Sequence, residues 1–219
     1  MAPAGFCFYG GEMALEPTKK RAISFIDGQN LYHCAKEAFG YGHPNYDPLK
    51  LSQKVSNNNG WMLKQARFYT GYPPINIDPL WGAYWQKRLL AISRQGVKHF
   101  ARELRVRTRQ VTLNNGEIHD VKVCEEKGID VRIAIDVIRL ALDNEYDVAI
   151  IFSQDQDLSE VASEIKKISR TQDRWIKIAS AFPIGNGTVN RRGINGTDWL
   201  PIDKVTYDCC IDERDYRPK

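Results

Sequence analysis

The stretch Asp147-Val-Ala-Ile-Ile-Phe-Ser-Gln-Asp155-Gln-Asp157-Leu158 joins a buried strand to an acidic turn. Its apolar run VAIIF, residues 148–152, is typical of a strand covered on both faces, and a helical pattern follows the two aspartates. In open parallel sheets the functional crevice lies at the carboxyl ends of the strands. Two carboxylates at that place suit a hard divalent cation, although aspartate also caps helices and starts turns.

Two further aspartates occupy comparable places. The short apolar run at 22–26 ends in Asp27, before a helical pattern, and Asp130 follows Gly128 at the start of a long apolar helix. Carboxylates gathered at such junctions would repel one another, which raises their pKa values unless a cation neutralises them. The cluster therefore implies a metal ion. The predicted metal-binding and catalytic acids are Asp27, Asp130, Asp155 and Asp157.

Asp136 lies in the same apolar helix but, on spacing alone, not on the same side. It follows Asp130 by six residues, which is about 240° around a helix of 3.6 residues per turn. Arg132, Asp136, Arg139 and Asp143 instead make a ladder of opposite charges at spacings of three and four. This ladder predicts a solvated stripe and a structural Asp136.

The hydrophobic period alternates between that of strands and that of helices along the chain, which favours a three-layer α/β domain with a mostly parallel central sheet. Asn114-Asn115-Gly116 is a predicted hairpin turn, and 183–198 is predicted to be a flexible loop. The predicted strands are 22–27, 63–70, 97–106, 120–124, 147–152 and 175–181. The predicted helices are 30–39, 48–57, 79–95, 130–144 and 156–169.

Composition bounds the class of protein. The 219 residues carry a net charge of +4 and 42% hydrophobic residues, as in an ordinary globular protein, and the mildly basic balance is compatible with a polyanionic partner. No apolar run approaches the roughly 20 residues of a membrane span, and the amino terminus does not resemble a signal peptide. Five cysteines without a paired spacing argue against zinc and against a disulfide scaffold, so a cytoplasmic location is expected.

Polar residues beside the predicted acids suit phosphodiester chemistry, in which a divalent cation activates water and stabilises the leaving oxygen. Asn30, Ser153 and Gln154 could orient water or a scissile phosphate. Lys127 could contact a phosphate, and it is equally interpreted as an exposed loop lysine.

Basic and aromatic residues suggest further contacts with a nucleic acid. Arg105, Arg107 and Arg109 share one face of an extended segment and could track phosphates, or they protect an edge strand from aggregation. Tyr69, Tyr72 and Trp81 either stack on bases or pack in the core. Arg191-Arg192 in the predicted loop could also approach a nucleic acid.

Three ordered motifs together resemble the NYN branch of the PIN-like nucleases, and in particular its LabA-like (DUF88) group. They are FIDGQNLY at 25–32, EKGIDVRIAIDVI at 126–138 and IIFSQDQDL at 150–158. The resemblance implies an α/β/α fold, an acidic site for Mg²⁺ or Mn²⁺, and ribonuclease activity. By position it assigns Asp27, Asp130, Asp155 and Asp157 to the metal and Asn30 to the site, with Asp136 as a second-tier candidate.

The sequence departs from this group in the last motif, which commonly reads SGDSDF. Gln154 stands in place of a glycine and Leu158 in place of an aromatic residue, while the acids are intact. The motifs set the expected organisation: a loose arm at 1–20, the nuclease domain at 21–182, and a loop and tail at 183–219 that pack on it. Residues 71–120 and the tail carry no motif of the group and are expected to decide substrate and partners.

The sequence therefore predicts a metal-dependent ribonuclease that uses Mg²⁺ or Mn²⁺. Asn30, Ser153, Lys127, Arg105 and Arg107 are its predicted substrate contacts. A non-catalytic RNA-binding or regulatory module is the main alternative, and a DNA nuclease or phosphatase with the same acids is another. RNA is the expected partner, and no association with a membrane is expected. The sequence does not decide whether the protein forms a homo-oligomer, how many metal ions it binds, or whether it cleaves as an endonuclease or an exonuclease.

Overall fold

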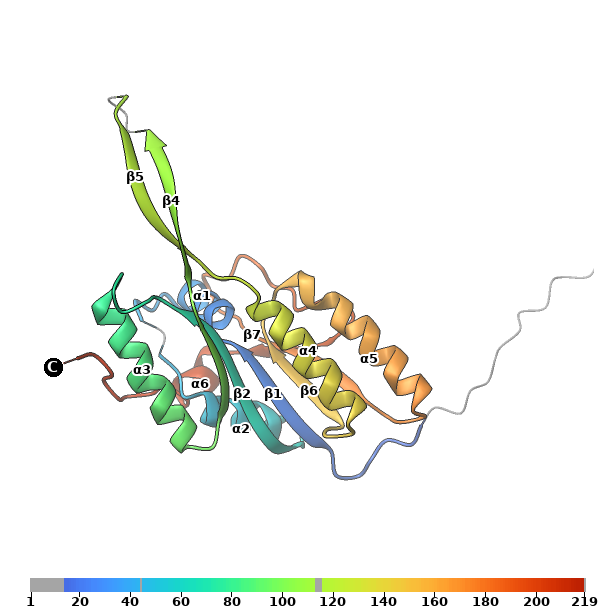
Figure 1. Cartoon of the computed structure of the whole chain (residues 1–219). Coiled ribbons are helices and arrows are strands. Elements are labelled where there is room, and N and C mark those ends of the chain that lie inside the picture. The colour runs from blue at the N-terminus through green and yellow to red at the C-terminus, as the bar shows by residue number, and fades with distance from the viewer. Residues whose placement is uncertain (1–13, 44, 113–115, 219) are drawn as a thin grey trace, which may run out of the picture.

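A six-stranded parallel sheet forms the centre of the molecule (Figure 1), in the order β3-β2-β1-β6-β7-β8. The computed structural model describes residues 14–43, 45–112 and 116–218. Residues 1–13 of the expected arm and Asn114 and Asn115 of the predicted turn lie outside that range. The strands of this sheet are β1 (Arg21–Asp27), β2 (Met62–Tyr72), β3 (Lys98–Glu103), β6 (Val148–Phe152), β7 (Lys177–Pro183) and β8 (Asp198–Ile202).

Helices cover both faces of the sheet, so the predicted three-layer α/β arrangement is confirmed. Along β1, Ala22 and Ile26 belong to one buried cluster, whereas Ile23 and Phe25 belong to the other. The first cluster packs against α1 (Gly28–Phe39), α2 (Pro48–Asn58), α3 (Pro79–Arg94) and α6 (Lys204–Asp208), and the second against α4 (Ile129–Leu142) and α5 (Ser159–Thr171). In the described chain, none of these helices is both long and apolar enough to cross a membrane.

Aspartates fix where the first three helices begin. Asp27, Asp47 and Asp78 cap α1, α2 and α3, each accepting a hydrogen bond from a backbone N–H of the first turn. Proline at the first position of α2 and α3 supports these starts, since its missing N–H costs nothing there. The five predicted helices are all present, the last one beginning with the short 3₁₀ turn η1 (Gln156–Leu158).

Strand order reverses next to β1. From β1 the chain adds β2 and then β3 on one side, while β6, β7 and β8 extend the sheet on the other. The carboxyl ends of β1 and β6 are neighbours, because Ile26 pairs in register with Phe152. A crevice at such a reversal is the usual ligand site of open α/β sheets, and Asp27 and the turn that carries Asp155 both follow directly.

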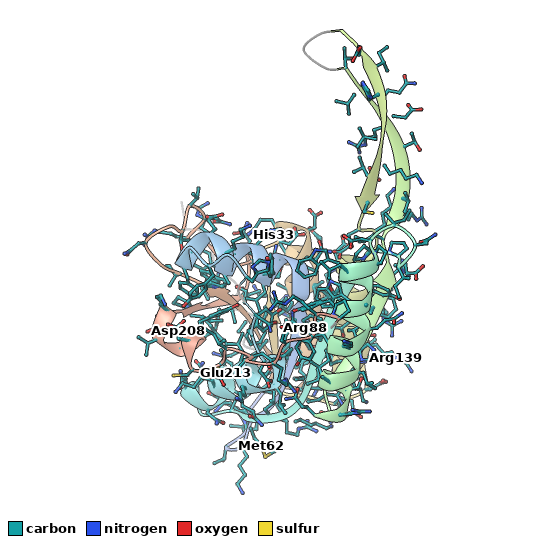
Figure 2. The ribbon with its side chains drawn as sticks, turned by 90° about the vertical axis from the view of Figure 1, so that its left-hand side faces the viewer. His33, Met62, Arg88, Arg139, Asp208 and Glu213 are labelled. Atoms are coloured by element: carbon teal, nitrogen blue, oxygen red, sulfur yellow. The ribbon has the colours of Figure 1, made fainter. Side chains whose placement is uncertain are left out.

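The predicted strand 97–106 is wrong as a single element. The chain leaves the sheet at Leu104 and continues as β4 (Arg105–Thr112), which pairs antiparallel with β5 (Ile118–Glu125). This hairpin projects from the body in Figure 1, and Figure 2 shows its side chains standing in the open on both sides. Every residue of β4 is exposed, so the ribbon has no core of its own, and an isolated two-stranded hairpin is marginally stable at best.

The segment after residue 183 contains two elements that the sequence did not predict. After the loop at 184–197, β8 pairs parallel with β7 and becomes the last strand of the sheet, and α6 follows it. Pro201 in β8 is tolerated because an edge strand leaves one side without a ladder partner. The tail then continues past α3, where Asn45 and Asp212 exchange hydrogen bonds.

Candidate metal-dependent active site

Asp27 is the last residue of β1 and the cap of α1, so its carboxylate lies at the switch point of the sheet. Its Oδ1 accepts a hydrogen bond from the backbone N–H of Asn30 at 3.0 Å, and the residue is only 7% exposed. Burial raises the pKa of Asp27 to about 7, and the negative charges of Glu126 and Asp155 add to the rise, against the lowering by the Asn30 bond. Asp27 is therefore a buried acid beside other acids.

The turn after β6 is held by its own hydrogen bonds and by α1. The N–H of Asp155 donates to Ser153 Oγ at 3.1 Å, and the N–H of Asp157 donates to Asp155 Oδ1 at 3.0 Å. Asn30 Oδ1 accepts from the Gln154 N–H at 3.0 Å, which joins this turn to the first turn of α1. Asp155 is half-buried beside Asp27, whereas Asp157 is exposed.

Glu126 belongs to the site, although sequence reasoning missed it. Its Oε2 accepts a hydrogen bond from the Gly71 N–H at 2.7 Å, an approach that needs glycine, since a Cβ on Gly71 would lie 2.6 Å from that oxygen. Burial raises the pKa of Glu126, and Asp130 raises it further. The sequence feature that could have indicated Glu126 is its place in the motif that contains Asp130. Its contact with Gly71 of β2, however, joins residues that are far apart in the sequence.

Asp130 reaches the site from the first turn of α4. Gly128 caps that helix with φ of +76°, a left-handed conformation that glycine adopts without strain. A carboxylate in a first turn is favoured by the positive end of the helix dipole. Asp130 is half-buried and acts electrostatically on Glu126, so the chain of acids runs from Asp155 through Asp27 and Glu126 to Asp130.

No basic side chain neutralises this chain of acids in the part of the protein that the structure describes. Four nearby arginines pair elsewhere: Arg67 and Arg132 with Asp136, and Arg107 and Arg109 with Glu125. Buried negative charge without a partner is costly, and oxygen donors of this kind fit Mg²⁺ or Mn²⁺. Among the described residues, however, no three acids, histidines or cysteines lie close enough together to hold one metal ion. The donor chemistry fits a divalent cation, and the ligands are not fully assembled.

Asp136 has a different environment, and its prediction as part of a solvated stripe is wrong. It is 4% exposed and accepts a hydrogen bond from the Tyr69 hydroxyl at 2.8 Å. Its carboxylate pairs with Arg132 at 3.0 Å, as the spacing predicted, and with Arg67 of β2 at 3.3 Å. Tyr69 is buried, so of its two predicted roles it packs in the core and does not stack on a base.

The predicted phosphate contacts lie where the hairpin joins the body. Arg105 and Arg107 lie on one face of β4, which is an edge strand of the two-stranded ribbon that it forms with β5, so contact with phosphate and protection of an edge both stay predictions. Arg107 pairs with Glu125 at 3.3 Å, and Arg109 pairs with the same carboxylate. Lys127 is exposed, and its carbonyl accepts a hydrogen bond from Arg102.

Gln154, which stands in place of a glycine, fastens the late loop to the site. Its Nε2 donates to the carbonyls of Asn190 and Arg192 at 2.8 and 2.7 Å. Gln156 adds a bond to the carbonyl of Gly193 at 3.1 Å. The exposed Arg191 and Arg192 are thereby held next to the turn that carries Asp155.

A parallel α/β/α sheet with acids gathered at its switch point defines a class of proteins that bind ligands or cations at this edge. The NYN domain family matches residues 21–172, more than half of the chain, and the chain belongs to this family. NYN domains belong to the PIN-like nuclease superfamily, whose members generally use divalent metal ions. The assignment to the LabA-like group stays a prediction.

Three solved structures match the chain at low identity. A protein of unknown function from Vibrio parahaemolyticus is 18% identical, with a TM-score of 0.47, over 87% of this chain and 97% of that one. Ribokinase from Giardia lamblia is 10% identical, with a TM-score of 0.36, over 84% of this chain and 58% of that one. MurG from Acinetobacter baumannii is also 10% identical, with a TM-score of 0.30 and coverage of 83% and 45%. No curated protein matches the chain.

Proposed function

We propose that this protein is a metal-dependent ribonuclease that cleaves RNA phosphodiester bonds with Mg²⁺ or Mn²⁺ at the switch-point acids. The observation that carries the proposal is the desolvated Asp27, whose pKa is raised to about 7 by burial and by Glu126 and Asp155. A bound cation would offset the negative charge of these acids, and the proposal is supported by membership of a family within the PIN-like nucleases, which generally use divalent metal ions.

Asp27 and Asp155 are the proposed primary ligands, with Glu126 and Asp130 on the side of α4 and Asp157 acting through water. Mg²⁺ keeps several waters and commonly needs only one or two carboxylates together with substrate phosphates, so three preassembled ligands are not required. When bound, the cation would supply an activated water and offset the charge of the leaving oxygen. Asn30 and Ser153 are proposed as positioning residues, because their hydrogen bonds hold the β6 turn.

Exposed basic side chains on both sides of the acids are the proposed phosphate contacts. Arg105, Arg107 and Lys127 lie at the base of the hairpin, and Arg191 and Arg192 lie in the loop that Gln154 fastens. Backbone contacts of this kind bind RNA without reading its sequence. They would place an RNA strand across the acids that lie between the hairpin base and the late loop.

The test is degradation of labelled single-stranded RNA with Mn²⁺, Mg²⁺ or EDTA, comparing the wild type with Asp155→Asn. We expect cleavage that needs the metal and that falls in the variant by more than the roughly 100-fold typical of losing an outer partner of a metal ligand. Ser163→Ala, on the exposed side of α5, is the matched control and should cleave at the wild-type rate. A fully active Asp155→Asn would contradict the site, and parallel DNA and phosphomonoester substrates would expose a different specificity.

One observation favours a second function, a non-catalytic RNA-binding module. Among the described residues no three potential ligands are close enough to hold one metal ion. In that case the same acids would shape a binding surface without turnover. RNA that binds wild type and Asp155→Asn alike, with no cleavage in any metal, would establish the module in place of the nuclease.

A further inference from the structure

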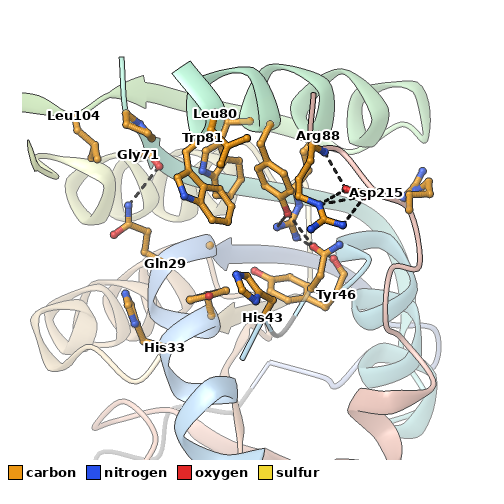
Figure 3. Close-up of a pocket in the computed structure, with 18 of the residues that line it drawn as sticks. Gln29, His33, His43, Tyr46, Gly71, Leu80, Trp81, Arg88, Leu104 and Asp215 are labelled. Atoms are coloured by element: carbon orange, nitrogen blue, oxygen red, sulfur yellow. Dashed lines mark hydrogen bonds and ion pairs between the residues drawn. The ribbon is translucent and has the colours of Figure 1, made fainter. Parts of the chain in front are cut away.

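A cavity of about 790 Å³ opens beside the acidic site, between α1 and α3. Its wall includes Gly28 and Gln29, the two residues after Asp27, and Gly71, whose N–H binds Glu126. Figure 3 shows Gln29 and His33 on one side, Leu80 and Trp81 on the other, and Asp215 of the tail at the end. The size is typical of a small-ligand site, and the shared wall places it next to the proposed chemistry.

Aromatic rings dominate the lining. Trp81, Tyr84, Trp85 and Arg88 lie on one stripe of α3, at spacings of three and four residues. Such a stripe is commonly core, but here it faces the cavity, and Trp81 is only half-buried. His43 is stacked with Trp81, with 17° between the planes and ring centroids 6.1 Å apart. Flat faces of this kind are what nucleobases stack on.

Arg88 is a buried cation without an acidic partner. It is 4% exposed and donates to the Tyr84 hydroxyl at 3.2 Å and to the Tyr46 carbonyl at 3.0 Å. The other arginines of the wall, Arg214 and Arg217, both pair with carboxylates, whereas Arg88 has none within ion-pair distance in the described chain. Its charge is supported by nearby aromatic rings instead, including Tyr46 at 5.5 Å.

Two polar atoms of this wall have no hydrogen-bond partner in the described structure. They are the Nε of Arg88 and the hydroxyl of Tyr46, which is itself 1% exposed. Buried donors are nearly always satisfied, and these two belong to residues that line the cavity. Both groups can donate to a carbonyl oxygen.

We propose that this cavity binds one nucleobase of the RNA strand next to the cleaved phosphate, with its ring against Trp81 and a base carbonyl oxygen at Arg88. The inference rests on the proposed ribonuclease function and adds a base-recognition site to it. Uracil, cytosine and guanine carry such a carbonyl oxygen and adenine does not. The site would therefore give a nuclease with sequence-neutral phosphate contacts a preference against adenine at one position.

Binding without cleavage tests the proposal. Fluorescein-labelled oligouridylate and oligoadenylate are titrated in EDTA against wild type, Trp81→Leu, Trp81→Phe and Trp175→Leu, with folding checked by thermal melting. Oligouridylate should bind wild type about tenfold more tightly than oligoadenylate, although adenine stacks well on any ring. Trp81→Leu should lose about tenfold in affinity for oligouridylate, the scale of one base–aromatic stack. Trp81→Phe should recover most of that affinity.

Trp175 is the matched control, because it is equally half-buried but precedes β7 at the opposite end of the strands. Trp175→Leu should bind as wild type does. Arg88→Met should remove the preference for uracil while stacking remains, and its melting curve shows whether it is folded. Wild-type affinity in Trp81→Leu, or no preference between the two oligonucleotides, would overturn the base site.

A free nucleotide could offer the same base, so uridine monophosphate is titrated in parallel. Binding as tight as that of the oligonucleotide would overturn the assignment to the RNA strand and identify a free-nucleotide site. Cleavage is read separately, in Mn²⁺. Cleavage by a wild type that shows no base selectivity would refute only the base site in the cavity. Selective binding without cleavage would refute only the proposed nuclease activity.

Discussion

Two buried aspartates of this protein, Asp27 and Asp136, differ in what surrounds them. Asp136 is held by Arg67, Arg132 and the Tyr69 hydroxyl, so its charge is compensated within the fold. Asp27 is nearly as buried, at 7% against 4% exposed, but its charged neighbours are Glu126 and Asp155. The comparison teaches that burial does not distinguish a structural acid from a functional one, whereas the sign of the surrounding charge does.

The largest expected effect concerns the pH dependence of stability without metal. Because the pKa of Asp27 is raised from 3.8 to about 7 in the folded protein, the folded state binds more protons than the unfolded state between these values. The free energy of unfolding should therefore fall as pH rises from 4 to 7, by up to about 4 kcal/mol from this group. Urea denaturation in EDTA at several pH values measures it.

Asp27→Asn is the comparison that isolates this effect, because the amide oxygen can still accept from Asn30 and carries no charge. The variant should be more stable than wild type at pH 8 and should lose the advantage near pH 4. A difference between the two proteins that stays constant over this range would mean that Asp27 titrates normally.

The second effect has the opposite sign. Asp136→Asn leaves Arg67 and Arg132 without their carboxylate, and breaking a buried ion pair commonly costs about 3–5 kcal/mol. Because the Arg132 side chain is 40% exposed, solvent screening should bring the loss to about 2 kcal/mol. Asp143→Asn removes the exposed pair with Arg139 on the same helix and should change stability by less than about 1 kcal/mol. Equal melting temperatures for these two variants would contradict the distinction.

A smaller effect is expected at Glu126. Glu126→Gln removes one negative charge next to Asp27 but keeps an oxygen that can accept from Gly71. Affinity for Mn²⁺, measured by calorimetry, should fall by about tenfold, as for an outer partner of a metal ligand. Glu125→Gln, one residue earlier and bound to arginines of the hairpin, should leave the affinity unchanged. The proposed role of Glu126 fails when the two variants behave alike.

The smallest effect is expected on the hairpin. Arg105→Ala should weaken RNA binding in EDTA by about threefold and reduce the slope of log affinity against log salt by about 0.7, the contribution of one contact to a single-stranded phosphate. Arg139→Ala, on the exposed side of α4, should change neither. An unchanged salt slope in Arg105→Ala would leave the hairpin without a part in RNA binding.

The strands that flank the site could be predicted because both are buried on two sides. The runs at 22–26 and 148–152 are continuously apolar, and each ends in a polar turn with an aspartate. β8 was missed for the opposite reason, since Asp-Trp-Leu-Pro-Ile at 198–202 has a proline and an exposed edge. Its pairing with β7 is a tertiary contact that no local pattern carries.

Side-chain environments were the part that the sequence could not supply. The spacing of Asp130 and Asp136 predicted that they do not share one side of α4, but it did not predict that Arg67 of β2 would pair with Asp136. Glu126 depends in the same way on Gly71. Both contacts join residues more than 50 positions apart, so they exist only once the sheet has formed.

Mn²⁺ binding tests the central claim most directly, by calorimetry on wild type, Asp27→Asn, Asp155→Asn and Asp136→Asn. Wild type should bind the ion, and the Asp27 and Asp155 variants should lose most of that affinity. Folded Asp136→Asn should keep it, because in the wild type arginines already neutralise the Asp136 carboxylate. Equal binding by all four proteins, or binding lost only in Asp136→Asn, would contradict the assignment of the switch-point acids as the metal site.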